Sequence, residues 1–186
     1  MTVVIGVGND FRRDDGAGPA VVTALRGRVA ATLAVTDGEP ARLIDLWAGA
    51  DLAIVVDAVR SDPPDPGRVH EFGAELDSGD AGPTRFTRRP VTDHALGLGD
   101  AVALGLAVDR MPGRLRILAI EGLDFGFGRG LTPRVAAAVD AVADRIAAAP
   151  ALSARRPPVE EEEQMLIAPA PPATRPSRQR TGDRPS

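Results

Sequence analysis

Three side chains that could bind a metal ion lie next to strand-like or helix-like segments of the chain. Asp15 lies in the loop after the apolar run 3–7, Asp57 directly follows the run 52–56, and His94 opens a helix-like segment. In an open α/β sheet, ligands bind outside the carboxyl ends of the strands, so residues from distant loops can converge there. Two carboxylates and one imidazole would make an open site for a borderline divalent metal, with positions left for water or substrate.

Each of these residues also has a purely structural interpretation. Asp14 and Asp15 precede a glycine, and acids in that position often shape a turn. Asp57 could cap a helix or bind a loop by hydrogen bonds. His94 could be a capping or surface residue, although Asp93 is better placed for the N-cap.

The residue types that the chain lacks narrow the chemistry further. It has 186 residues with no cysteine and no tyrosine, and all 22 basic side chains are arginine. This excludes a thiolate nucleophile, a Schiff-base lysine and a phosphate-binding P-loop lysine. No serine precedes Arg60, so attack by water remains the simple route, either polarised by a metal or activated by a carboxylate base. The second histidine, His70, falls on a polar segment where a solvated or cross-strand role is expected.

Short apolar runs alternate with helical periods along the first four-fifths of the chain, which is typical of an α/β domain. We expect strands over 3–7, 31–36, 52–56, 67–72 and 115–120, and helices over 18–29, 41–48, 94–108 and 132–149. The strand at 67–72 is the most polar, which favours an edge position. Residues 73–92 form a long connection, and loops of that length are usually functional or mobile.

The composition changes near residue 150. Eight of the 17 prolines lie in 150–186, together with the acidic run 160–163 and a short apolar patch at 165–168. Such a segment buries too little apolar surface to offset its ordering entropy. We therefore expect one domain over 1–149 and a disordered tail over 150–186.

Charge and composition also bear on partners and location. A net charge of −4 and 3% aromatic residues argue against nucleic-acid binding, which needs a basic, stacking surface. No apolar run reaches the roughly 20 residues of a membrane helix. The opening residues lack the features of a signal peptide, so we expect a cytoplasmic protein with no membrane partner.

The glycines near the N-terminus do not form a dinucleotide-binding motif. Phe11 stands where a third glycine is required after Gly6 and Gly8. We expect these glycines to permit a tight turn and a close backbone approach, with Asn9 organising the loop that carries the two acids.

Four ordered segments together resemble the hydrogenase maturation protease family. They are GVGNDFRRDDGAG at 6–18, IVVDA around Asp57, DHALGLGD around His94 and GLTPRV at 130–135. The resemblance spans about residues 1–149. Enzymes of this family remove a C-terminal peptide from the large-subunit precursor of nickel–iron hydrogenases.

This resemblance implies a fold, a site and a partner. The fold is a three-layer α/β/α sandwich with a twisted, mostly parallel five-stranded sheet. The implied activity is that of an endopeptidase on a hydrogenase large-subunit precursor, with nickel carried by the substrate and contacted by Asp15, Asp57 and His94. Asp14 would then shape the turn. The chain reads Asp-Gly-Glu-Pro at 37–40, where the family commonly has a DGGT-type segment that helps to recognise the precursor, which puts the hydrogenase class in question.

Other functions stay open at this stage. A metal-dependent hydrolase of a small amide or ester could use the same trio. A non-catalytic nickel-binding assembly factor could carry the fold and the cation site without cleaving anything. A nucleotide-binding module is the weakest alternative, because the third glycine and any lysine are missing.

Overall fold

The structure, a computed structural model, describes residues 1–75 and 96–149. Its strands are β1 (Thr2–Val7), β2 (Thr32–Thr36), β3 (Leu52–Val59), β4 (Val69–Glu75) and β5 (Arg114–Glu121). Its helices are the 3-10 helix η1 (Arg13–Gly16) and the α-helices α1 (Ala17–Leu25), α2 (Pro40–Trp47), α3 (Leu96–Ala107) and α4 (Pro133–Ala147).

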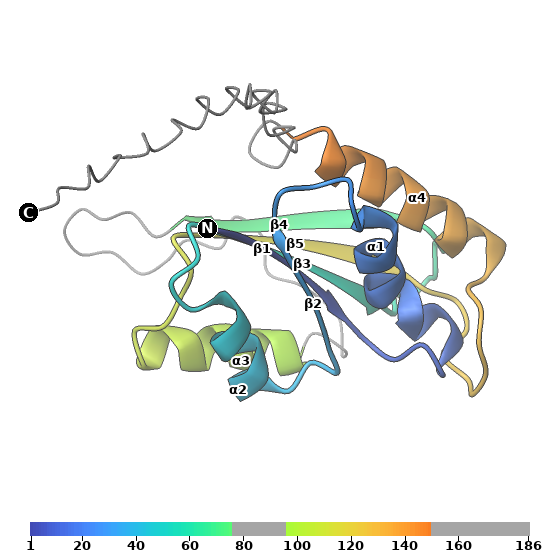
Figure 1. Cartoon of the computed structure of the whole chain (residues 1–186). Helices are drawn as coiled ribbons and strands as arrows, with labels where there is room; N and C mark the ends of the chain where they lie inside the picture. The colour runs from blue at the N-terminus through green and yellow to red at the C-terminus, as the bar shows by residue number, and fades with distance from the viewer. Residues whose placement is uncertain (76–95, 150–186) are drawn as a thin grey trace, which may run out of the picture. The chain divides into compact units, whose positions relative to one another are not determined.

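The five strands form one sheet in the order β2-β1-β3-β5-β4. All neighbouring pairs are parallel except β4 and β5, which are antiparallel. Helices α1 and α4 cover one face of the sheet, and α2 and α3 cover the other (Figure 1). The fold predicted from the sequence, an α/β/α sandwich with a mostly parallel sheet and the polar strand at an edge, is therefore confirmed.

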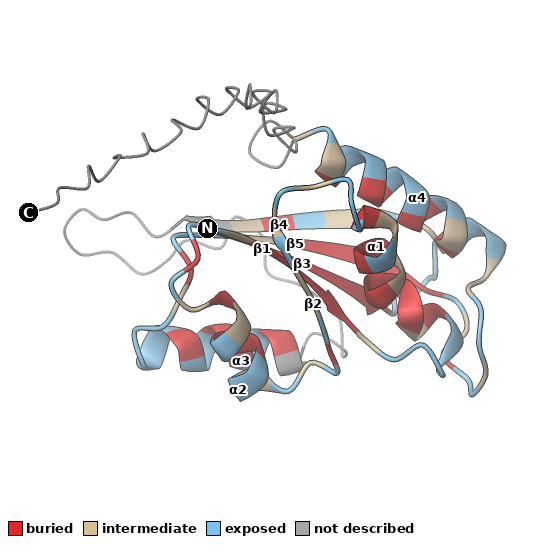
Figure 2. Cartoon of the chain, viewed as in Figure 1, coloured by how far each residue is buried: buried red, intermediate tan, exposed pale blue. Residues whose placement is uncertain are grey.

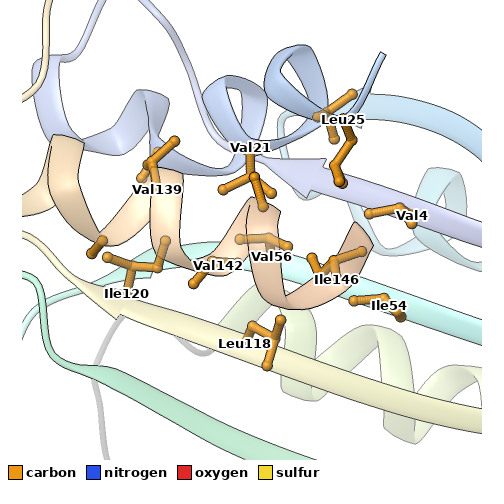
Figure 3. Packing of buried hydrophobic residues seen from close by; sticks show 14 of the residues in the cluster. Val4, Val21, Leu25, Ile54, Val56, Leu118, Ile120, Val139, Val142 and Ile146 are labelled. Atoms are coloured by element: carbon orange, nitrogen blue, oxygen red, sulfur yellow. The ribbon is translucent and has the colours of Figure 1, made fainter. Parts of the chain in front are cut away.

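Strand β3 lies at the centre of the sheet, and all of its residues are buried (Figure 2). Side chains alternate between the two faces of a strand, so Ile54 and Val56 join the core beneath α1 and α4. Figure 3 shows these two residues packed among Val21 of α1 and Val142 of α4. Burying an aliphatic side chain of this size contributes about 1.5–3 kcal/mol.

The alternate residues of β3 face the other helical layer. Ala53, Val55 and Val59 pack in the second core with Trp47 of α2 and residues of α3. The indole nitrogen of Trp47 donates a hydrogen bond 3.1 Å long to the carbonyl oxygen of Arg110, so this large buried side chain has its polar atom satisfied.

Several element boundaries differ from those that the sequence predicted, β4 for example covering Val69–Glu75 instead of 67–72, and two of the differences have a clear cause. Strand β3 continues to Val59 instead of ending at Val56, because its pairing with β5 runs from Ala53 to Val59. Helix α1 ends at Leu25, four residues before the predicted end, since Arg26 is extended and Gly27 adopts a positive φ of 73°.

Some predictions fall outside the described residues. These include most of the 73–92 connection, the tail at 150–186 and His94, so the domain boundary at 149 stays a prediction. No described helix has both the length and the hydropathy needed to cross a bilayer.

Candidate functional site

A pocket of about 310 Å³ opens where the carboxyl ends of β1, β2 and β3 meet. In the sheet, β2 lies on one side of β1 and β3 lies on the other, so the strand order reverses direction at β1. Open α/β sheets bind ligands at such a switch point. Its lining residues are Val7, Gly8, Asn9, Arg12, Asp15, Asp37, Gly38, Asp57, Ala58 and Leu98. The structure thus brings Asp15 and Asp57 into one pocket, as the sequence predicted.

Asp57 lies within β3, not after it. It pairs with Ala119 of β5, and the alternation of the strand turns its side chain toward the α2 and α3 layer. The residue is only 8% exposed. One carboxylate oxygen, Oδ1, accepts a hydrogen bond 2.8 Å long from the amide of Ala58, and within 1–75 and 96–149 no group donates to the other oxygen. The expectation that Asp57 ends its strand is corrected by the extra β3–β5 pairs.

The surroundings of Asp57 change its acidity. Burial raises the pKa of this carboxyl, the hydrogen bond from Ala58 partly opposes the effect, and the nearby carboxylate of Asp15 raises it further, to about 7. A carboxyl group with a pKa near neutrality can exchange protons during catalysis. A bound divalent cation would favour its charged form instead.

Asp15 reaches the pocket from η1, the short helix that follows the first loop. Its side chain is half-buried, and its Oδ2 accepts a hydrogen bond 3.0 Å long from the amide of Asn9. Gly8 has a φ of 130°, and a Cβ atom there would overlap the carbonyl oxygen of Asp15. The glycine is therefore required both for the turn and for the close approach.

Asp14, the neighbour of Asp15, is fully buried and is not among the residues that line the pocket. It accepts hydrogen bonds from the amides of Leu123, Asp124 and Thr132 and from the hydroxyl of Thr132. Burial raises the pKa of Asp14, but these hydrogen bonds outweigh it and leave the pKa below its usual value. The role in shaping the turn that the resemblance implied for Asp14 agrees with these contacts.

Four further pocket residues were not predicted as site residues. Val7 and Arg12 belong to the N-terminal motif, Ala58 follows Asp57, and Leu98 lies in the first turn of α3. Their only sequence signal was their place inside the matching segments. Asp37 and Gly38, which the sequence analysis linked to substrate recognition, also line the pocket.

The structure describes one of the two histidines. His70 lies on β4 and its Nε2 contacts Oε1 of Glu121 on β5. Burial raises the pKa of Glu121, but His70, the amide of Asp65 and Ser61 outweigh it and leave the pKa below its usual value. The cross-strand role expected of His70 is confirmed. His94 lies outside the described residues.

The described carboxylate oxygens could bind a divalent cation, but they do not make a complete metal site. Asp15 and Asp57 each have one oxygen to which no described group donates, and oxygen ligands of this kind suit hard or borderline divalent ions. No group of three or more potential ligands occurs in the described part of the chain. A third protein ligand would have to come from residues beyond it.

Several solved structures share this fold. The hydrogenase maturating endopeptidase HybD from E. coli matches with a TM-score of 0.60 at 23% identity, over 78% of this chain and 89% of that chain. The NiFe hydrogenase maturation protease HybD from Thermococcus kodakarensis gives 0.58 at 24% identity, over 78% and 95%. An endopeptidase from Escherichia coli gives 0.63 at 22% identity, over 78% and 90%.

No protein-family model matches the chain, and no curated protein does. At these identities the likeness to the solved structures establishes a common fold. It confirms the fold that the resemblance in the sequence predicted.

Proposed function

We propose that this protein is an endopeptidase that removes the C-terminal extension of a nickel–iron hydrogenase large-subunit precursor after nickel insertion. The observation that carries the proposal is the meeting of Asp15 and Asp57 in one pocket at the switch point of the sheet. Proteins of this fold named as hydrogenase maturation proteases support it.

The nickel in this proposal belongs to the substrate. Asp15 and Asp57 each offer an oxygen without a described donor, and His94 is the proposed third ligand. Leu98, which belongs to the same DHALGLGD segment of the sequence as His94, lines the pocket. A precursor without nickel lacks the cation that the two carboxylates need, so cleavage would wait for metal insertion.

The proposed reaction is attack by water on the scissile carbonyl. The water oxygen bonds to the carbonyl carbon, the carbon–nitrogen bond breaks, and the released amine takes a proton. The chain has no cysteine or lysine, so an acyl-enzyme on a thiol and a lysine-activated nucleophile are both excluded. We propose that the reaction takes place in the cytoplasm.

The experiment is mass spectrometry of a purified precursor, loaded or not loaded with nickel, after incubation with this protein. We expect one shortened product from the loaded precursor only. Asp15→Asn, Asp57→Asn and His94→Ala should each slow its formation at least a hundredfold, and His70→Gln, outside the pocket, should not. Full-rate processing by the Asp15 and Asp57 variants would refute the assignment. A stable complex with unshortened precursor would favour an assembly factor instead.

A further inference from the structure

Two loops beside the pocket are joined by backbone hydrogen bonds. The amide of Gly128 donates to the carbonyl of Phe11 at 2.9 Å, and the amide of Arg13 donates to the carbonyl of Gly128 at 3.0 Å. The amide of Asp14 donates to the carbonyl of Asp124 at 2.9 Å. The first loop follows β1 and the second follows β5, so segments more than 100 residues apart lie side by side.

These two loops carry large apolar side chains in contact with solvent. Phe127 is 92% exposed, Phe11 is 58% exposed and Leu123 is 56% exposed. We call these three residues the apolar strip. Exposed apolar residues that are scattered singly are ordinary, but a group of them on one surface marks an interaction site.

The strip is held in place by groups beneath and beside it. The buried carboxylate of Asp14 accepts hydrogen bonds from three amides of the second loop. Arg13 adopts a positive φ of 50° and its Nε lies 3.2 Å from Oδ2 of Asp124. The guanidinium of Arg129 lies 4.2 Å from the centre of the Phe11 ring. The exposed rings therefore stand on a backbone that is already ordered. Binding a partner would cost little conformational entropy in these two loops.

The strip adjoins the pocket through the chain neighbours of Phe11. Phe11 lies between Asn9 and Arg12, which both line the pocket, and its amide donates to Oδ1 of Asn9. Arg12 is exposed and has no acidic partner in the part of the chain that the structure describes. A partner that covers the strip would thus meet apolar rings flanked by the guanidinium groups of Arg12 and Arg129.

We infer that the apolar strip docks the folded body of the protein substrate whose chain end enters the pocket. The complementary surface on that substrate is an apolar depression with carboxylates at its rim. This inference rests on the proposed function and adds to it how the substrate is recognised. Aromatic anchors surrounded by arginine are typical of the residues that dominate binding at protein interfaces.

The test compares the strip with exposed apolar residues elsewhere. Phe127→Ser removes the most exposed ring, and Arg129→Glu reverses the charge beside Phe11. The double variant Leu106→Ser, Val108→Ser is the matched control, because these side chains, in the last turn of α3 and directly after it, are 40% and 49% exposed. KM and kcat are measured for precursor cleavage, and the Kd for precursor is measured in an Asp57→Asn background.

We expect Phe127→Ser and Arg129→Glu each to raise KM and Kd at least tenfold, with kcat within twofold, and the control to change neither. Unchanged KM and Kd in an active enzyme would overturn the docking inference alone. Loss of a self-associated form without a change in KM would assign the strip to a second copy of this chain. Binding that depends on Phe127 without any cleavage by the wild type would uphold docking and overturn the peptidase. Absence of both binding and cleavage in the wild type would overturn both.

Discussion

Oδ1 of Asp14 accepts a hydrogen bond 2.6 Å long from the amide of Thr132, a residue 118 positions further along the chain. Through this contact and three others, Asp14 fixes the first loop to the segment after β5. The next residue, Asp15, lines the pocket, and its side chain accepts a single described hydrogen bond. Two adjacent aspartates thus have separate tasks, one in holding the loop and one in the site.

Replacing Asp14 should therefore affect stability far more than replacing Asp15. Asp14→Asn replaces one carboxylate oxygen with an NH₂ group, which would face the amides that donate to Asp14 in the wild type. We expect a loss of about 3 kcal/mol in the free energy of unfolding. Asp15→Asn is the matched control, expected to change stability by less than about 1 kcal/mol. Urea unfolding at pH 7 measures both. Equal losses for the two variants would contradict the division of roles.

The acid stability of the protein follows from the same group. The pKa of Asp14 is lower in the folded protein than in the unfolded chain, so its contribution is present above the unfolded value of about 4 and is lost as the pH falls below it. The stability difference between wild type and Asp14→Asn should shrink as the pH is lowered from 6 to 2. A difference that stays constant over this range would show that the carboxylate charge is not involved.

Asp57 gives the opposite pH dependence in the metal-free protein. Its pKa rises from about 4 in the unfolded chain to about 7 in the fold. The folded protein then keeps a proton that the unfolded chain loses, so stability falls as the pH rises from 4 to 7 and is level above that. Asp57→Asn should be more stable than wild type at pH 8, by at most about 4 kcal/mol, and similar to it at pH 4.

Urea unfolding in the presence of a chelator at pH 4 and pH 8 measures this effect. Asp140→Asn, on the exposed side of α4, serves as the control for a lost carboxylate and should show no such gain. A wild type whose stability does not fall between pH 4 and pH 7 would contradict the raised pKa.

Gly18 tests the packing of α1 against the sheet. A Cβ atom at this position would overlap the carbonyl oxygens of Val7 and Val56, so Gly18→Ala must push the helix away from β1 and β3. We expect a loss of about 3 kcal/mol or more. Gly99 on α3 faces open space, and Gly99→Ala should raise stability by about 0.5–1 kcal/mol. Thermal unfolding compares the two, and similar effects would contradict the close approach.

His70 and His94 should separate stability from activity. His70→Ala leaves the buried carboxylate of Glu121 without one donor, and we expect a loss of about 2 kcal/mol with precursor cleavage within twofold of wild type. His94→Ala should abolish cleavage. Unfolding and precursor cleavage are measured in parallel for both variants. A cleavage defect in His70→Ala at temperatures where it is fully folded would contradict a purely structural role for His70.

The sequence by itself determined the architecture and the place of the pocket. The alternation of apolar runs and helical periods predicted the α/β fold, and the position of Asp15 and Asp57 after strand-like runs predicted their convergence. These predictions succeeded because the side-chain periodicity of a strand is a local property of the sequence. The order of strands and helices then places ligand sites at the carboxyl ends of the parallel strands.

The tertiary structure decided what each side chain experiences. Asp14 and Asp15 are the same residue type at adjacent positions, and only the amides delivered by the loop after β5 distinguish them. The raised pKa of Asp57 depends on the layers packed around β3. The exposure of Phe127 beside Phe11 likewise results from backbone pairing between distant loops. These properties arise from contacts between segments far apart in the chain, which residue patterns within one segment do not encode.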